Sequence, residues 1–241
     1  MPQFLIDPKT IRGSTASIVG SEAKHLIRVL RYRAGDSLWV SDGAHRYRAL
    51  IENIGSKEVS LKLIEAIPLA LAAPSPVLGV ALLKPDILKW VLQKGVELGV
   101  GEFILFSTQR TIPRLSEQSA NKLARFEKIA LEAAKQSGMI SVPKIHPPLS
   151  FDHLVKRFSE FSVVLLFWEE EKESSFQTVF QTIDPSRMLI LIGPEGGWTN
   201  EEIDQAKKAG AKTAGLGQQI LRSETAALAA LSLCQYELGN L

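Results

Sequence analysis

The sequence contains very little cysteine and histidine. A single cysteine, Cys234, excludes an internal disulfide and any metal cluster built on cysteine ligands. Because it lies in an apolar stretch with helical spacing, we expect it to pack in a core. The four histidines lack the spacing of metal ligands: His25, His45, His146 and His153. We therefore expect no metal centre and a location in the reducing cytoplasm.

Several motifs of nucleotide and hydrolase chemistry are also missing. No GxxxxGK[ST] is present, no GxGxxG follows an apolar run, and there is no GxSxG. A P-loop, a Rossmann dinucleotide site and a hydrolase elbow are therefore unsupported. The longest apolar runs, such as 77–83, are far shorter than the roughly 20 residues of a membrane helix. The first residues lack the apolar centre of a secretion signal, so we expect no membrane association.

Charge is nearly balanced but unevenly distributed. The net charge is +2 over 241 residues, yet residues 1–68 hold ten Lys or Arg against seven Asp or Glu. Four basic residues fall between Ser21 and Gly35 against one acid, Glu22: Lys24, Arg28, Arg31 and Arg33. Such a cluster is as typical of a solvated helix face as of a nucleic-acid contact.

The pattern of elements changes near residues 67–76, an uncharged segment rich in Ala and Pro where we place a domain boundary. Before it, turns at Asp42-Gly43 and Gly55-Ser56 separate short strands, which predicts a small β-barrel. One helix is expected there, with Leu26, Ile27, Val29 and Leu30 as its apolar set. The expected strands are 37–41, 47–54 and 58–67.

After this boundary, apolar strands alternate with helices. The expected strands are 77–83, 103–107, 163–168 and 189–192, with a short extended piece at 142–145 before Pro147-Pro148. The expected helices are 86–98, 119–136 and 225–238, the last apolar on nearly all sides and therefore buried. This alternation predicts an α/β fold with a parallel sheet covered on both faces. The charge block 169–173 is read as a solvated loop.

Two glycine-rich loops stand out near the C-terminus. LILIGPEGGWTNEEI reads as a strand, a turn and a helix whose first turn is capped by Thr199 and Glu202. LGQQILRSETAALAAL repeats this arrangement with Gly215 and Gly217. Both loops would lie at the carboxyl edge of the parallel sheet, which predicts a ligand pocket built largely from main chain. The glycines would also serve simple tight turns.

These loops are part of a wider resemblance. They resemble the RsmE family of SPOUT methyltransferases, as do KHLIRVLRYRAGDSLWVSDG, KPDILKWVLQKGVELGVGEF and KLARFEKIALEAAKQSG, in the same order. Members of this family methylate N3 of a uridine in 16S ribosomal RNA with S-adenosyl-L-methionine. Two positions depart from the family pattern. Met139 stands where an Arg is usual, and Trp198 replaces the more usual Phe.

The resemblance implies a PUA-like RNA-binding barrel at 1–72 and a SPOUT domain at 73–241 with a trefoil knot near its C-terminus. It further implies a homodimer that acts on 16S rRNA, with an assembled small subunit as the expected substrate. The implied cofactor contacts are Ile192, Gly193, Glu195, Gly196, Gly197, Leu216, Gly217, Ile220, Leu221 and Arg222. The implied RNA contacts are Lys24, His25, Arg28, Arg31, Arg33 and Arg110, with Arg114 nearby.

The implied catalytic residues are Arg222, Glu224 and Glu195. The N3 proton of uracil is about as weak an acid as a tyrosine phenol, so its removal must be assisted. Arg222 could stabilise the charge that develops on a uracil oxygen, and Glu195 or Glu224 could accept the proton. A helix-start ion pair or cap is the alternative role for Arg222 and Glu224.

Two other functions fit the same sequence. One is a SPOUT methyltransferase with a different RNA target. The other is an RNA-binding protein that keeps the fold without the chemistry. Mapping of the modified nucleotides tests the first alternative, and a measurement of cofactor binding tests the second.

Overall fold

The computed structural model describes residues 3–68, 74–112 and 119–241. The chain forms two compact units. The N-terminal unit comprises residues 1–72 and 134–142, and the C-terminal unit comprises 73–133 and 143–241. The expected boundary between residues 72 and 73 lies outside the described residues.

A five-stranded sheet forms the N-terminal unit. Its strand order is β1-β3-β4-β5-β2, with β1 parallel to β3 and the other neighbours antiparallel. The strands are β1 (Gln3–Leu5), β2 (Thr15–Val19), β3 (Ser37–Ser41), β4 (His45–Ile54) and β5 (Glu58–Pro68). The three strands expected from the sequence are confirmed. β1 and β2 were missed because three and five residues carry too little alternation to read.

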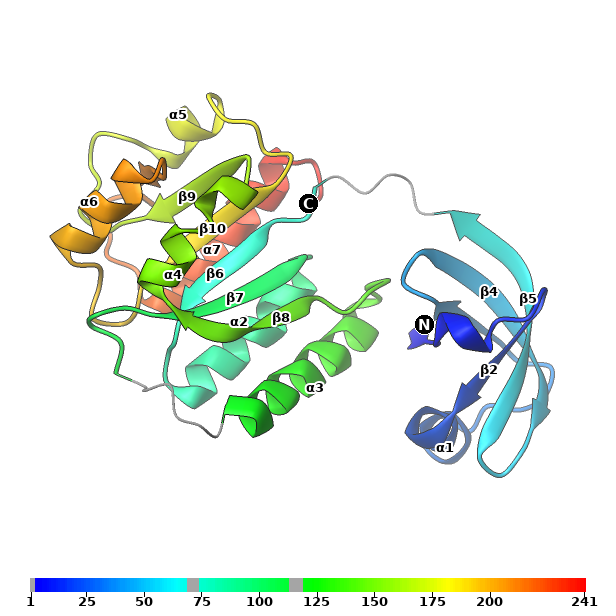
Figure 1. Cartoon of the computed structure of the whole chain (residues 1–241). Coiled ribbons are helices and arrows are strands. Elements are labelled where there is room, and N and C mark those ends of the chain that lie inside the picture. The colour runs from blue at the N-terminus through cyan, green and yellow to red at the C-terminus, as the bar shows by residue number, and fades with distance from the viewer. Residues whose placement is uncertain (1–2, 69–73, 113–118) are drawn as a thin grey trace. The chain divides into compact units, whose positions relative to one another are not determined.

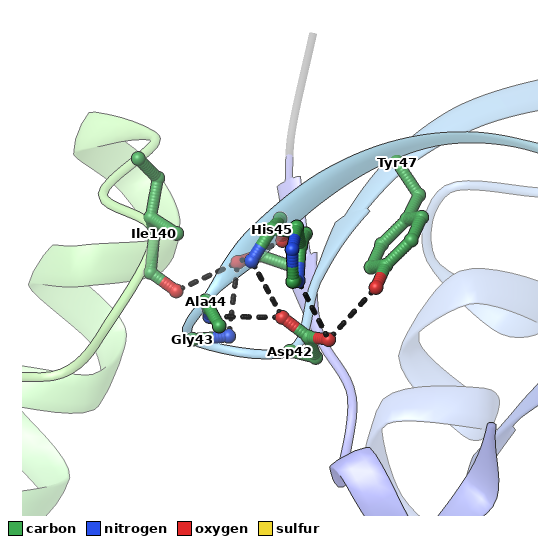
Figure 2. Close-up of polar contacts among 7 residues, drawn as sticks. Asp42, Gly43, Ala44, His45, Tyr47 and Ile140 are labelled. Carbon is green, nitrogen blue, oxygen red and sulfur yellow. Dashed lines mark hydrogen bonds and ion pairs between the residues drawn. The ribbon is translucent and has the colours of Figure 1, made fainter. Parts of the chain in front are cut away.

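The turn between β3 and β4 is fixed by the carboxylate of Asp42 (Figure 2). Its Oδ1 accepts hydrogen bonds from the backbone N–H groups of Ala44 at 2.8 Å and His45 at 2.7 Å. Its Oδ2 accepts one from the Tyr47 hydroxyl at 2.9 Å. Burial raises the pKa of Asp42, but these hydrogen bonds outweigh it and leave the pKa below its usual value.

The segment after helix α3 (Ser119–Ser137) is held by main-chain carbonyls. Ser41 Oγ donates to the Ile140 carbonyl at 2.8 Å, beside the Asp42 turn in Figure 2, and Gln3 Nε2 donates to the Met139 carbonyl at 3.1 Å. Since only backbone atoms of Met139 take part, this contact does not need the Arg that is usual at that position.

Helix α1 (Gly20–Arg28) is shorter than its apolar pattern predicted. Leu26 is fully buried, but Val29 and Leu30 lie beyond the helix and are 63% and 36% exposed, so the expected apolar set does not form one buried face. The helix ends at Arg28, and Arg31 adopts a left-handed φ of 57° that turns the chain away. The turn leaves apolar and basic side chains on one exposed surface.

The C-terminal unit is a six-stranded, wholly parallel sheet with the order β11-β9-β10-β6-β7-β8 (Figure 1). Its strands are β6 (Val77–Ala81), β7 (Glu102–Ser107), β8 (Lys144–Ser150), β9 (Val163–Phe167), β10 (Met188–Ile192) and β11 (Lys212–Ala214). Every residue of β6, β9 and β10 is buried, as continuous apolar strands predicted. The expected α/β fold is confirmed.

Helices cover both faces of this sheet. Besides α3, they are α2 (Pro85–Glu97), α4 (Phe151–Val155), α5 (Phe176–Phe180), α6 (Asn200–Lys208) and α7 (Ser223–Glu237), with a 3-10 turn at Phe158–Glu160. A second 3-10 turn, Pro8–Thr10, belongs to the N-terminal unit. Helices α4 and α6 share one core with the side chains of β6, β7, β9 and β10 that face them. Helices α2 and α7 lie on the opposite face (Figure 1).

Two strands of this sheet differ from expectation. Strand β8 continues through Pro147 and Pro148 to Ser150, instead of stopping before them. Proline is tolerated because β8 is an edge strand, where one side of the backbone needs no sheet partner. Strand β11 was not expected, since three residues with one buried pair give no sequence pattern.

Helix α7 was expected to be buried on all sides, and this is wrong. Leu233 is 40% and Tyr236 is 69% exposed, whereas Ala230, Leu231 and Cys234 are fully buried. The prediction that Cys234 packs in the core is confirmed, and burial raises the pKa of its thiol to about 12. None of the helices in the described part of the chain is long and apolar enough to cross a membrane.

Helix α7 leaves the edge strand β11 and packs against α2, β6 and β10 in the middle of the sheet. The buried amide of Gln235 donates to the carbonyls of Leu98 at 2.6 Å and Gly99 at 3.0 Å. Gly99 has a φ of 80° and ends α2 as expected. These bonds satisfy carbonyls that the end of α2 leaves free.

Candidate active site

A cavity of about 440 Å³ opens at the carboxyl edge of the parallel sheet. Segments that follow β6, β9, β10 and β11 contribute its walls. The lining residues are Lys84, Ile87, Phe167, Trp168, Glu169, Ile192, Gly193, Pro194, Glu195, Gly197, Trp198, Leu216, Gly217, Gln219, Ile220, Leu221, Arg222, Ser223, Glu224 and Ala226. This is the edge where ligands bind in open parallel sheets.

The first glycine loop connects β10 to α6. Its expected capping box is present: Thr199 Oγ1 accepts from the Glu202 N–H at 3.2 Å, and Glu202 Oε2 accepts from the Thr199 N–H at 3.0 Å. At Gly193 a Cβ would lie 2.8 Å from Trp198 Nε1, so the indole leaves no room for a side chain. Gly197 has a φ of 71°, which favours glycine.

The side chain of Trp198 packs beneath this loop, against the sheet and α4. Its Nε1 donates to the Phe167 carbonyl at 3.0 Å, and its ring packs 5.9 Å from that of Phe106 and 5.2 Å from that of Phe151. The indole N–H therefore joins the β10 loop to the end of β9. A Phe, which is more usual here, would lack this donor.

The second glycine loop follows β11. At Gly215 a Cβ would lie 2.5 Å from the Glu171 carbonyl oxygen, and the Gly215 N–H donates to the Ser174 carbonyl at 2.9 Å. Gly217 has a φ of 112°. Ile220 lines the cavity and is nevertheless 81% exposed, so its apolar side chain is accessible to a ligand in the cavity.

The acidic block before α5 supports this second loop. Thr213 Oγ1 donates to Glu171 Oε2 at 2.6 Å, and the N–H groups of Glu173 and Ser174 donate to its other oxygen. The Glu171 side chain is only 9% exposed, so the expectation of a fully solvated loop is wrong at this residue. Burial raises its pKa, but the hydrogen bonds and Lys207 outweigh this and hold the pKa below the usual 4.5.

We predict that Glu171→Gln makes the free energy of unfolding less dependent on pH in the acidic range. A lowered pKa in the folded state stabilises the fold fully above the unfolded value near 4.5, and this contribution is lost as the pH falls through the folded value. The variant should lose about 1 kcal/mol at pH 7, and the difference should shrink below pH 4.5. Urea unfolding at several pH values measures it.

Glu173→Gln is the matched control, because this exposed neighbour uses only its backbone in the network. It should leave the free energy of unfolding nearly unchanged at every pH. An equal deficit of Glu171→Gln at pH 4 and pH 7 would contradict the stabilising role of the charge.

The three expected catalytic residues all line the cavity. Arg222 is the N-cap residue of α7, and no described residue pairs with its guanidinium; α7 has no side-chain cap. The alternative role of a cap or ion pair with Glu224 is therefore absent from the described contacts. Glu195 Oε1 accepts the backbone N–H of Lys84 at 3.3 Å, at the start of α2.

All the expected cofactor residues line the cavity except Gly196. At Gly196 a Cβ would lie 3.1 Å from Arg110 Cβ, so this glycine accommodates Arg110. The sequence reading missed Lys84, Phe167, Trp168 and Glu169. Lys84 was findable, because it follows an apolar strand at its carboxyl end. Trp168 and Glu169 carried the same signal, because they lie at the carboxyl end of the expected strand 163–168.

The expected RNA contacts do not lie in the cavity. Lys24, His25, Arg28, Arg31 and Arg33 are all exposed on α1 and the turn after it, and no described residue forms an ion pair with them. Arg110 follows β7 and bonds to the first glycine loop, while Arg114 lies outside the described residues. Across 3–68, 74–112 and 119–241, no group of His, Cys, Asp and Glu could hold a metal ion.

Sequence profiles define the class of protein. The RNA methyltransferase domain profile matches residues 73–235, and the RNA methyltransferase PUA domain profile matches residues 19–64. With the parallel sheet and its glycine-loop cavity, these matches describe an RNA methyltransferase that carries a PUA domain.

Individual relatives define the family. The chain is 35% identical to ribosomal RNA small subunit methyltransferase E of Bacillus subtilis over 92% of this chain and 90% of the relative. It is 31% identical to the Synechocystis protein of that name over 95% and 76%. The Neisseria gonorrhoeae protein of that name, solved with bound S-adenosyl methionine, has a TM-score of 0.87 at 27% identity over 98% of both chains. The chain therefore belongs to the ribosomal RNA small subunit methyltransferase E family, and the RsmE resemblance is confirmed.

Proposed function

We propose that this protein transfers a methyl group from S-adenosyl-L-methionine to N3 of a uridine in 16S ribosomal RNA. The observation that carries the proposal is the cavity, in which two glycine loops meet Arg222, an arginine with no partner among the described residues. The Neisseria gonorrhoeae relative was solved with S-adenosyl methionine, and the Legionella pneumophila structure with the same cofactor is 25% identical with a TM-score of 0.83.

The residues of the cavity fit this cofactor. Glycines at 193, 197 and 217 let the backbone approach a ligand closely, and two of them have a positive φ. The open side chains of Ile220 and Leu216 would cover an adenine ring, which needs an apolar slot with a few backbone hydrogen bonds. When bound, S-adenosylmethionine supplies a methyl group on a sulfonium that is already a good leaving group.

Arg222 and Lys84 would handle the charge of the uracil. Both line the cavity as N-cap residues, of α7 and α2, and neither side chain has a hydrogen-bond partner among the described residues. Removal of the N3 proton spreads negative charge over both uracil oxygens, which two cations at one cavity can stabilise. The proton acceptor would be Glu195 or Glu224, and hydrogen bonding to the Lys84 N–H holds Glu195 in place.

The N-terminal unit would bind the RNA. We assign residues 1–72 to a PUA-like RNA-binding domain and 73–241 to the methyltransferase domain, consistent with the extents of the two matching profiles. The basic side chains of α1 would contact phosphates, and the adjoining exposed Val29 and Leu30 would pack against bases or sugars. Because this surface combines charged and apolar groups, we propose an assembled small subunit as the substrate. The protein would then act in the cytoplasm.

We also propose a homodimer and a C-terminal trefoil knot. Trp90 of α2 is 43% exposed, and Leu233 and Tyr236 of α7, which packs against α2, are exposed too, so both helices present large apolar side chains to solvent. The return of α7 from the edge of the sheet to its middle is compatible with a chain that passes through a loop. Sedimentation equilibrium should give twice the 26.5 kDa mass of the chain.

Calorimetric titration with S-adenosylmethionine tests the proposed function. We expect saturable binding at micromolar cofactor to the purified chain. No heat of binding at high micromolar cofactor would instead support an RNA-binding protein without the chemistry. Nucleotide mapping in a deletion strain tests the target, and an unchanged 16S uridine would reject it.

A further inference from the structure

Arg110 is bonded to the first glycine loop although 86 residues separate them along the chain. Its Nη1 donates to the Gly196 carbonyl at 3.1 Å and to the Trp198 carbonyl at 3.1 Å. These two carbonyls flank Gly197, which has a φ of 71° and whose own N–H donates to the Pro194 carbonyl at 3.0 Å. One guanidinium nitrogen thus holds the main-chain carbonyls of the residues before and after Gly197.

A second bond joins the loop after β7 to the first turn of α6. The Gln109 N–H donates to Glu202 Oε1 at 2.8 Å, while Glu202 Oε2 completes the capping box of α6. Glu202 is only 4% exposed, so both of its oxygens need these partners. The loop after β7 is itself shaped by the Thr108 N–H, which donates to Thr111 Oγ1 at 2.8 Å.

We propose that Arg110 is a positioning residue for the cofactor, and that it acts by holding residues 196–198 in their binding conformation. This inference rests on the proposed function. It replaces the RNA contact expected for Arg110, since Arg110 Nη1 donates to the carbonyls of Gly196 and Trp198. It also explains Gly196, where a Cβ would lie 3.1 Å from Arg110 Cβ and crowd the side chain that braces the loop.

The test compares Arg110→Ala with two other charge removals in the full-length chain. Lys208→Ala is the matched control, because Lys208 is exposed on the last turn of α6. Arg28→Ala serves as the reference for a phosphate contact on α1. For each variant, S-adenosylmethionine affinity is measured by calorimetry, and affinity for transcribed 16S rRNA is measured across a salt series.

Arg110→Ala should weaken cofactor binding about tenfold, the effect of losing a charge-assisted hydrogen bond, with an unchanged salt slope for RNA. Arg28→Ala should show the opposite pattern, with normal cofactor affinity and a salt slope reduced by about one. Lys208→Ala should change neither. In steady-state kinetics, Arg110→Ala should raise the KM for the cofactor and leave the KM for RNA unchanged.

A reduced salt slope with normal cofactor affinity in Arg110→Ala would overturn the inference and restore the phosphate contact. Equal cofactor affinity in Arg110→Ala and the wild type would overturn it while leaving the proposed function intact. Absence of cofactor binding by the wild type would overturn both. Arg110→Lys keeps the charge without the planar guanidinium, so it should retain the RNA salt slope and still bind the cofactor less tightly than the wild type.

Discussion

Replacement of Arg222 by alanine should reduce kcat for methyl transfer by at least about a hundredfold, the usual cost of removing one preorganised charge from a developing anion. Arg222 lines the cavity and has no described protein partner, so its charge is free to act on a substrate. Because α7 has no side-chain cap at this residue, the fold should survive the change. Single-turnover methylation with saturating cofactor measures the effect.

The pH dependence identifies the cause of this loss. If Arg222 stabilises the uracil anion, the rate of the variant should rise steeply with pH toward the N3 pKa of about 10, where the anion forms without help. The wild-type rate should rise less. Arg187→Ala is the control for loss of an arginine charge, since Arg187 directly precedes β10 at its amino end, away from the carboxyl ends of the strands where the cavity opens. Near-normal turnover of Arg222→Ala would remove this residue from the mechanism.

Replacement of Gly193 by alanine should weaken cofactor binding at least about tenfold and cost about 1–3 kcal/mol of stability through overpacking. The new Cβ would lie 2.8 Å from Trp198 Nε1, and the indole cannot yield without straining its hydrogen bond to the Phe167 carbonyl. Displacement of the indole would therefore move both the loop after β10 and the end of β9, which Trp198 joins. Calorimetry and thermal unfolding measure the two effects.

Gly210→Ala separates backbone strain from this collision. Gly210 has a φ of 94°, but a Cβ there would meet nothing within 4 Å, and the residue does not line the cavity. It should lose about 1 kcal/mol of stability and keep its cofactor affinity. If Gly193→Ala binds the cofactor as tightly as the wild type, the account of the first glycine loop is wrong.

The sequence predicted those features that local pattern determines. Continuous apolar runs predicted the four central strands, and the spacing of Thr199 and Glu202 correctly predicted both residues of the capping box. The cavity was predictable for the same reason. Glycine loops after parallel strands must share one edge of the sheet, and nine of the ten expected cofactor residues line it.

Contacts between distant segments could not be predicted in this way. Nothing near Arg110 in the sequence indicates that its partners are 86 and 88 residues away. Glu171 resembles its charged neighbours in the sequence, and its hydrogen bond to Thr213 comes from the unexpected strand β11, 42 residues away. The apolar sequence of α7 predicted burial, but it does not reveal that Leu233 and Tyr236 face outward in the monomer. Tertiary packing determines all three.

The most direct test of the proposed chemistry is methylation of small ribosomal subunits that lack the modification. Purified protein and isotopically labelled S-adenosylmethionine are incubated with these subunits, and nuclease fragments of the 16S rRNA are analysed by mass spectrometry. We predict one N3-methyluridine per 16S rRNA molecule, and formation at least about a hundredfold slower with Arg222→Ala. A labelled methyl group on another atom or another RNA, or no transfer by a protein that binds the cofactor, would contradict the account.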